Sequence, residues 1–222
     1  MTLNAPSCSA WRLYVIVDRA AAGSRPLAEI AAAAIRGGAD VLQLRDKTAP
    51  GKILLAEAAQ LLRLTRAAGI PLIINDRPDI ARASGADGVH LGQDDLPVAA
   101  ARRLLGPGRL IGKSTHSLEQ ARTAQTEGPD YIGVGPIFST PTNPDDEPGG
   151  LRRIGQVAEA VAVPAVCIGG IDEGNIEQVL EAGAQRIAVV RAVCAAAHPE
   201  AAARRLKDAL THFVRASALR GL

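Results

Sequence analysis

Aromatic residues are scarce in this sequence: two Phe, two Tyr and one Trp make up only 2% of its 222 residues. Proteins that bind single-stranded nucleic acid stack the bases on aromatic side chains, so this scarcity argues against such a surface. Hydrophobic residues nevertheless make up 47% of the chain, which is enough for a sizeable core. We therefore expect a core of Ala, Val, Leu and Ile, side chains that suit parallel strands covered by helices.

Cysteine is scarce as well, and long apolar runs are missing. Cys8, Cys167 and Cys194 fit neither the spacing of a metal motif nor, being odd in number, a disulfide framework. We expect reduced thiols in a cytoplasmic protein, because no secretory signal and no apolar run of membrane length is found. The net charge of +2 is close to balance, and the basic residues are dispersed, so nothing calls for nucleic acid or a membrane as a partner.

Short apolar runs alternate with Ala-rich amphipathic stretches along the chain. Each run is rich in strand-forming residues and bounded by Gly, Pro, Asp or Asn, which predicts a strand. Between the runs, apolar residues recur at helical spacing, as at Leu54, Ala58 and Leu61. The eight expected strands are 12–17, 41–44, 72–74, 88–91, 110–112, 131–134, 165–168 and 186–190.

Eight strand–helix units predict an α/β protein with one (β/α)8 TIM barrel, a fold of about 250 residues. A doubly wound open sheet is the competing architecture, but eight units of this length favour the barrel. Residues 11–222 form the expected barrel domain, and residues 1–10 form a loose N-terminal leader. A homo-oligomer remains open.

Polar or glycine clusters follow nearly every expected strand, whereas the helix-to-strand connections contain mostly Gly, Ala and Pro. In a TIM barrel the loops after the strands form the active site. The asymmetry therefore predicts an enzyme whose site lies at the C-terminal ends of the strands.

Two cations, Arg45 and Lys47, follow the second expected strand. They are two residues apart, so on an extended segment they point the same way and suit a phosphate or diphosphate. The alternative is a pair of ordinary surface charges.

Two carboxylates, Asp76 and Asp95, follow the neighbouring third and fourth strands. Hard oxygen ligands of this kind, completed by water and phosphate, suit Mg²⁺. Either aspartate alone could instead cap the helix that follows it.

Glycine and hydroxyl residues follow the later strands. Gly149-Gly150 and Gly169-Gly170 lie where barrels commonly bind a phosphate on loop amides, and Thr140 and Thr142 would add hydroxyl donors. The alternative for each glycine pair is a tight turn.

Two histidines lie in or shortly after an expected strand. His116 follows the fifth strand, where it is either a general acid–base or a hydrogen-bonding structural residue. His90 lies within the fourth strand, and we expect it to be packed in the core.

Taken together in this order, six segments resemble the thiamine-phosphate synthase family. The resemblance runs from Leu13 to about Ala195. The segments are Gln43–Lys47, Asn75–Asp79, Gly88–Asp95, Gly133–Phe138, Thr140–Thr142 and Ile168–Ile171.

This resemblance implies a transferase that uses Mg²⁺. A hydroxymethylpyrimidine diphosphate would be joined to a thiazole phosphate, or to its carboxylated form, giving thiamine phosphate and pyrophosphate. Both partners are small molecules. Departure of pyrophosphate leaves a pyrimidine-methyl cation, so the enzyme needs leaving-group stabilisation, orientation and exclusion of water more than a strong base.

The resemblance also assigns residues. Catalytic roles would fall to Arg45, Lys47, Ser114 and Asn143, and metal binding to Asp76 and Asp95. The substrate-binding residues would be Gln43, Leu44, Arg45, Asp46, Lys47 and Asn75 on the pyrimidine diphosphate side, Ser114 at the pyrimidine, Asn143 near the pyrophosphate, and Thr140, Pro141, Thr142, Gly170, Val190 and Arg191 on the thiazole phosphate side.

One position departs from the family pattern. A lysine usually follows the Thr-x-Thr segment, but this chain has Asn143 there, followed by acidic residues. Arg191, where the family often has a small residue, is the candidate for a substitute cation. The departure favours one alternative, a catalytically weakened protein that binds thiamine phosphate. A second alternative is a thiazole tautomerase-like relative that uses His116 as acid and base. Such relatives tend to lose the metal aspartates and the Arg-x-Lys pair, which this chain keeps.

Overall fold

Eight parallel strands form a closed barrel in the computed structural model, which describes residues 8–142 and 147–220. Each strand pairs with the next in sequence, and the last returns to the first, so the predicted TIM barrel is confirmed. The strands are β1 Leu13–Asp18, β2 Val41–Arg45, β3 Leu72–Asn75, β4 Gly88–Leu91, β5 Leu110–Thr115, β6 Tyr131–Val134, β7 Ala165–Ile168 and β8 Ile187–Val189.

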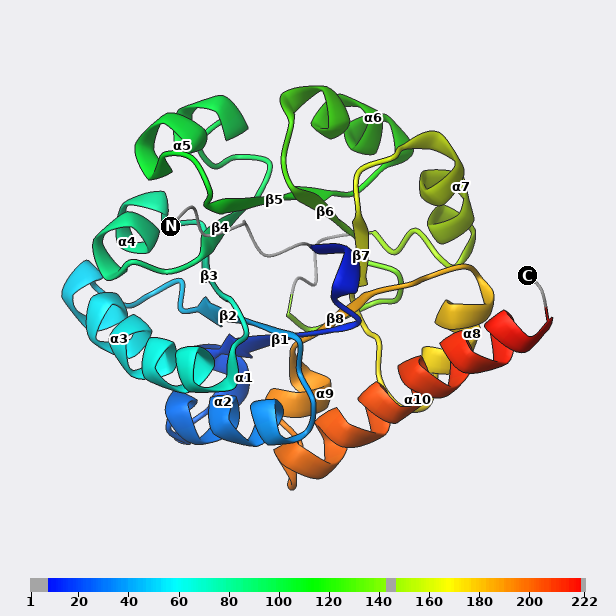
Figure 1. Ribbon diagram of the computed structural model, residues 1–222, viewed down its shortest axis with the longest axis horizontal. Coiled ribbons are helices and arrows are strands. Elements are labelled where there is room, and N and C mark those ends of the chain that lie inside the picture. Colours follow the sequence, from blue (N-terminus) through cyan, green and yellow to red (C-terminus); the bar gives the residue numbers. More distant parts are fainter. Residues whose placement is uncertain (1–7, 143–146, 221–222) are drawn as a thin grey trace.

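The helices form an outer ring around the strands (Figure 1). Because a helix follows nearly every strand, the loops after the strands gather at one end of the barrel. The helices are α1 Arg19–Ala22, α2 Leu27–Arg36, α3 Gly51–Ala68, α4 Pro78–Ser84, α5 Val98–Leu105, α6 Leu118–Glu127, α7 Arg152–Ala160, α8 Ile176–Glu181, α9 Arg191–Cys194 and α10 Pro199–Arg220.

Two apolar clusters fill the molecule, one on each side of the strand wall. The larger cluster lies between strands and helices and consists almost entirely of Ala, Val, Leu and Ile, as expected. The expectation is wrong for the smaller cluster, inside the barrel, where Trp11, Tyr14 and Tyr131 lie together. Their ring centroids are 5.3–6.0 Å apart, so three of the five aromatic residues form the floor of the barrel.

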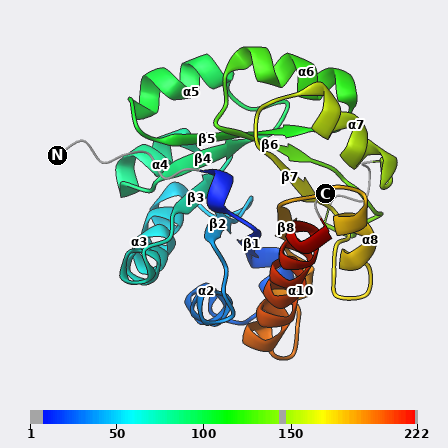
Figure 2. The ribbon, with the colours of Figure 1, turned by 45° about the vertical axis from the view of Figure 1, so that its right-hand side comes forward.

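The two ends of the chain close the ring. The long helix α10, red in Figures 1 and 2, packs against α2 and β1 near the start of the chain. Lys207 Nζ lies 2.6 Å from the Asp40 carboxylate, which also accepts hydrogen bonds from the amides of Arg12 and Leu13. Asp40 therefore ties α10 to the beginning of β1.

The N-terminal leader lies partly outside the described residues, which begin at Cys8. Cys8–Ala10 form a short 3-10 helix in which Cys8 is buried, and Arg186 donates a hydrogen bond to the Cys8 carbonyl. All three cysteines are free and buried, as the expectation of reduced thiols requires.

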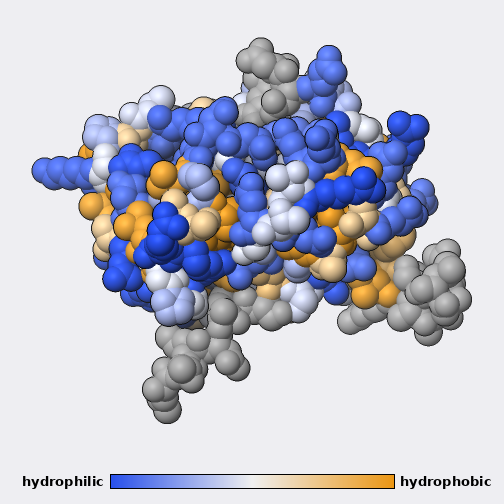
Figure 3. Space-filling view, turned by 90° about the horizontal axis from the view of Figure 1, so that it is seen from above, coloured by the Kyte–Doolittle hydropathy of each residue, from blue (hydrophilic) through white to orange (hydrophobic). Residues whose placement is uncertain are grey.

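The face of the molecule seen in Figure 3 is largely hydrophilic, with hydrophobic residues between polar ones. Over the part of the chain that the structure describes, no helix combines the length and the apolar character needed to cross a bilayer.

Candidate active site

A cavity of about 460 Å³ opens at the C-terminal ends of the strands. Its wall comes from β1, β2 and β4–β8 and from the loops that follow β5–β8. The structure thus brings together about half of the site residues predicted from sequence. Those in the wall are Gln43, Ser114, His116, Thr140, Pro141, Thr142, Gly170, Val190 and Arg191.

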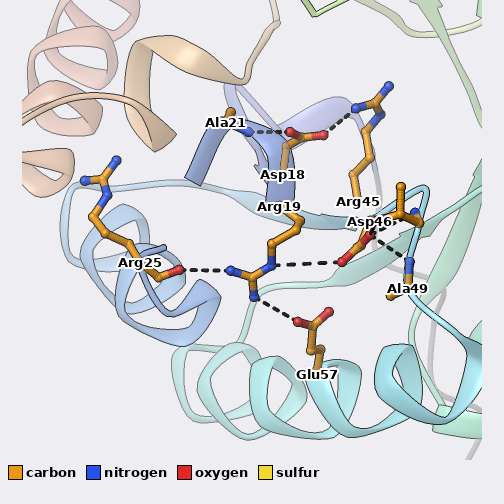
Figure 4. A network of polar contacts seen from close by, with 9 residues as sticks. Asp18, Arg19, Ala21, Arg25, Arg45, Asp46, Ala49 and Glu57 are labelled. Carbon is orange, nitrogen blue, oxygen red and sulfur yellow. Dashed lines mark hydrogen bonds and ion pairs between the residues drawn. The ribbon is translucent and has the colours of Figure 1, made fainter. Parts of the chain in front are cut away.

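Arg45 ends β2 beside this cavity, and its position is fixed by an ion pair. Its guanidinium contacts the carboxylate of Asp18, at the end of β1 (Figure 4). Asp18 is buried and also accepts a hydrogen bond of 2.8 Å from the Ala21 amide, which caps α1. The Arg45 side chain is 14% exposed, so it reaches the mouth of the barrel with little freedom to move.

The Asp46 side chain stabilises the loop after β2 and does not line the cavity. Its carboxylate accepts hydrogen bonds of 2.9 Å from the amides of Thr48 and Ala49, and it lies 3.9 Å from Arg19. Figure 4 shows Arg19 reaching on to Glu57 of α3. The predicted contact of Asp46 with substrate would therefore come from its backbone, because its side chain holds the loop that carries Lys47.

Lys47 and Asp76 connect the ends of β2 and β3. Lys47 Nζ lies 3.9 Å from Asp76 Oδ2, and the lysine side chain is 59% exposed. Asp76 has the left-handed backbone angle φ 59°, which is uncommon for a residue other than glycine. Its amide donates a hydrogen bond of 2.8 Å to the His90 carbonyl of β4, which holds this turn in place.

The Asp76 and Asp95 carboxyls face each other. Burial, followed by the neighbouring Asp95, raises the pKa of Asp76 to about 6, although Lys47 and Arg45 act in the opposite direction. Asp95 Oδ2 accepts a hydrogen bond of 2.6 Å from the Gly92 amide. Two carboxyls that disfavour each other's charge fit a cation between them.

This donor set suits a hard divalent cation. Asp76 and Asp95 offer only oxygen ligands, the kind that Mg²⁺ prefers, and Mg²⁺ usually keeps several waters beside one or two carboxylates. Within residues 8–142 and 147–220, no cluster of three or more His, Cys, Asp or Glu side chains forms a complete metal cage. The pair therefore fits a magnesium ion whose remaining ligands are water and phosphate oxygens.

Among the other predicted site residues, those at the strand ends do not line the cavity: Arg45, Asp46, Lys47, Asp76 and Asp95. Leu44 is fully buried in the cluster between strands and helices, so its side chain points away from the cavity. Asn75 is half-buried at the end of β3, opposite His90 in the strand register, but it does not line the cavity. Asn143 lies outside the described residues.

The far side of the cavity is built by a close approach of two loops. Gly170 has φ +66°, and an added Cβ would lie 2.7 Å from Phe138 Cβ and 2.7 Å from the Ser139 carbonyl. Only glycine fits here, so the Gly-Gly pair after β7 is more than a turn. It packs the loop that carries Thr140 against the turn after β7, and Thr140, Gly170 and Arg191 all line the cavity.

The barrel floor adds three functional candidates that the sequence interpretation missed. Tyr14, Tyr131 and His90 line the cavity from below and are joined by hydrogen bonds to one another and to Ser114. The expectation that His90 is a packed core residue is thus wrong in part, because its imidazole belongs to the cavity wall. Burial lowers the pKa of His90 to about 4, so the ring is neutral near pH 7.

Period-two alternation along the strands is the signal that could have found these residues. In a barrel strand every second side chain points inward, and Gln43 and Ser114 mark the inward positions of β2 and β5. The same alternation places Tyr14, His90 and Tyr131 inside.

His116 is held by the loop after β6. Its Nδ1 donates a hydrogen bond of 2.9 Å to the Gly135 carbonyl, and its amide donates one of 2.7 Å to the Gln120 side chain. The other ring nitrogen carries the lone pair in this tautomer. The structural role and a proton-transfer role are both compatible with this geometry.

Comparison with known proteins gives one consistent answer. A family model described as thiamine monophosphate synthase matches residues 13–193. A thiamine-phosphate synthase of Roseiflexus castenholzii is 50% identical over 197 residues, which cover 88% of this chain and 86% of that protein. One of Chloroflexus aurantiacus is 50% identical over 198 residues, covering 89% and 91%.

A solved structure agrees with these sequences. A thiamine phosphate pyrophosphorylase of Pyrococcus furiosus superposes with a TM-score of 0.85 at 36% identity, covering 92% of this chain and 97% of that one.

Proposed function

Because the chain belongs to the thiamine-phosphate synthase family and is a transferase, we propose how its own residues divide the work of that reaction. The pyrimidine ring would occupy the cavity between Gln43 and Ser114. Its diphosphate would lie at the mouth, against Arg45, Lys47 and the amide of Asn75. The thiazole phosphate would lie on the opposite wall.

The cationic side of the mouth supports this arrangement. Arg45 is oriented by Asp18, and Lys47 stays exposed beside Asp76, so two positive charges lie near the Asp76 carboxyl at the end of β2. Arginine and lysine near a leaving pyrophosphate stabilise the negative charge that develops on it. Both residues would therefore act most strongly as the bond to the diphosphate breaks.

Asp76 and Asp95 would hold Mg²⁺ at the same place. When bound there, the ion would neutralise charge on the diphosphate oxygens. Lys113 would support this pair, because it holds the Gly92 carbonyl while the Gly92 amide holds Asp95.

The thiazole side would be formed by Thr140, Thr142, Gly170 and Arg191, which all line the cavity. The hydroxyls and loop amides would bind the phosphate, and Arg191 would supply the charge that Asn143 lacks. Bond breaking then sends the electron pair of the C–O bond to pyrophosphate. The thiazole nitrogen forms the new C–N bond with its own lone pair.

One observation carries the proposal. Two cations, two facing carboxylates and a cavity with polar groups at its edges occur together at the end of one barrel, although they come from β2, β3, β4 and β5. A generic phosphate site needs only the cations.

The test incubates the purified protein with both substrates, with and without Mg²⁺, and looks for thiamine phosphate. We expect product only with the metal. Failure to form any product at high protein concentration would overturn the proposal. Tight binding of thiamine phosphate without turnover would instead support the weakened binding protein.

The dependence on Mg²⁺ also distinguishes the synthase from the tautomerase alternative. Proton shuttling by His116 on a neutral thiazole ring would need no metal. We therefore expect His116→Gln to change turnover less than Asp95→Asn does, and metal-independent proton exchange on the thiazole would favour the alternative.

A further inference from the structure

A continuous line of hydrogen bonds crosses the floor of the barrel from β2 to β5. Gln43 Nε2 lies 2.7 Å from the Tyr14 hydroxyl, which lies 3.0 Å from the Tyr131 hydroxyl. The Tyr131 hydroxyl lies 3.1 Å from His90 Nδ1, and His90 Nε2 lies 2.9 Å from Ser114 Oγ. All five side chains line the cavity.

The line has a direction, which follows from its first member. An amide nitrogen can only donate, so Tyr14 accepts from Gln43. Tyr14 is 2% exposed and Tyr131 is fully buried, so the single proton of each hydroxyl needs an acceptor nearby. Tyr14 then donates to Tyr131, and Tyr131 donates to Nδ1 of His90.

The direction decides what the two ends offer to a ligand. His90 with an acceptor at Nδ1 carries its proton on Nε2 and donates it to Ser114 Oγ. The Ser114 proton is then left for the cavity, so Ser114 is a donor. At the other end Gln43 gives one of its two amide N–H groups to Tyr14, which fixes the orientation of the amide and leaves its Oε1 as the acceptor.

We propose that Tyr14, Tyr131 and His90 are positioning residues that fix Ser114 as a donor and Gln43 as an acceptor, and that they thereby select an aminopyrimidine over its oxo counterpart. An aminopyrimidine has a ring nitrogen that accepts and an exocyclic amino group that donates. An oxopyrimidine presents a carbonyl and a ring N–H instead. In the same orientation its ring N–H would face the donor Ser114, and its carbonyl oxygen would face the acceptor Gln43 Oε1. This inference rests on the proposed function only for the identity of the ring.

The first test measures the direction itself. Nitrogen-15 spectra of the full chain labelled at its four histidines report which ring nitrogen of His90 bears the proton. We expect the Nε2–H tautomer in the free protein and a mixture of tautomers in Tyr131→Phe. An Nδ1–H tautomer or an imidazolium at pH 7.5 in the unaltered protein would overturn the proposal.

The second test measures selection. The ratio of kcat/KM for the amino- and oxopyrimidine diphosphates is compared between the unaltered protein and Tyr131→Phe. We expect the ratio to fall on the order of 10-fold in the variant, because Ser114 becomes free to donate or accept. KM for the thiazole phosphate should stay unchanged.

Two controls separate polarity from packing. Trp11→Phe disturbs the same tyrosine rings, whose centroids lie 5.9 and 5.3 Å from its own, but removes no hydroxyl. Trp11→Phe should leave the ratio unchanged. An equal fall in this variant would contradict the role of the line of hydrogen bonds. His90→Gln keeps a donor toward Ser114 and should retain more selection than His90→Leu.

The outcomes also distinguish this inference from the proposed function. A protein that makes no thiamine phosphate would refute the proposed function. The tautomer of His90 would still decide the direction of the line of hydrogen bonds.

Discussion

Lys113 donates a hydrogen bond of 2.7 Å from its Nζ to the carbonyl of Gly92, although the lysine is only 5% exposed. Its side chain leaves β5 on the helix side of the barrel wall and reaches the loop after β4. The amide of the same glycine donates to Asp95. A buried cation therefore braces the loop that carries one of the two proposed metal ligands.

Removing this brace should weaken metal binding more than catalysis. In Lys113→Met the Asp95 loop loses its fixed carbonyl, and residues that orient metal ligands commonly contribute about 10–100-fold to metal affinity. We expect the Mg²⁺ concentration for half-maximal activity to rise by about 10-fold, with kcat at saturating Mg²⁺ nearly unchanged. Lys52→Met, on the exposed face of α3, is the control. A drop in kcat without a change in metal requirement would contradict this role.

Asp76 should be needed for activity through its charge. Asp76→Asn keeps an oxygen at the proposed metal site but removes one negative charge, and we expect kcat/KM to fall on the order of 100-fold or more. Asp79→Asn, which alters an exposed carboxylate paired with Arg77, should leave activity within a factor of about two, the range of surface changes. Steady-state assays across Mg²⁺ concentrations measure both. Equal effects of the two changes would refute the metal role.

Arg191 should substitute for the cation missing at position 143. Arg191→Ser removes the positive charge from the cavity wall, and loss of an electrostatic donor of this kind costs on the order of 10–1,000-fold in rate. Asn143→Lys should raise turnover, and in the Arg191→Ser background it should restore much of the loss. Single-turnover rates measure this exchange, with Arg103→Ser on α5 as the control. If Asn143→Lys gives no recovery, the two positions do not substitute for each other.

Gly170 should be intolerant of any side chain. Gly170→Ala meets both the strain of a positive φ, about 1 kcal/mol, and the clash with Phe138 and Ser139, which adds about 1–3 kcal/mol. Gly69→Ala is a matched control, because Gly69 has φ +69° but nothing within 4 Å of an added Cβ. Urea unfolding should show the larger loss for Gly170→Ala, together with a higher KM for the thiazole phosphate. Equal losses would mean that the two loops can separate without cost.

The buried thiol of Cys167 should make stability depend on pH in the alkaline range. Burial raises its pKa from 9.0 to about 12, so the folded state keeps its proton where the unfolded chain releases it. The thiol's contribution is fully present below pH 9 and is lost as the pH rises from 9 toward 12. Between pH 8 and 10 we expect about 1 kcal/mol less stability from this group. Urea unfolding of Cys167→Ala at both pH values should show a smaller loss, and an equal loss would exclude Cys167 as the source.

Much of this architecture could be predicted from sequence because burial leaves a clear pattern in parallel strands. Both faces of such a strand are covered, so each is a short apolar run, and the residue where the run stops marks the mouth of the barrel. Arg45 ends β2 and Asp76 directly follows β3, so both are placed at the mouth in this way, and Asp95 lies in the loop after β4. The prediction needs no contact between distant residues, since the closed barrel brings all strand ends together.

The remaining parts depend on which way a side chain points and on what it meets. Leu44 and Asp46 stand beside Arg45 in sequence, yet one lies in the outer core and the other holds its own loop. Tyr131 and His90 lie 41 residues apart and give no local sign that they share a hydrogen bond. Such pairings follow from the register of β4, β5 and β6, which the apolar pattern leaves undetermined.

The contact of α10 with α2, and of Lys207 with Asp40, has a consequence for synthesis of the chain. β1 leaves the ribosome long before its partner β8 and the helix that secures Asp40. Until then β1 has one open edge, and Arg45, Asp76 and Asp95 are already translated without a closed mouth to hold them. The barrel therefore remains incomplete as an enzyme until β8 and α10 have been made, and its exposed edge is where a chaperone would have most to protect.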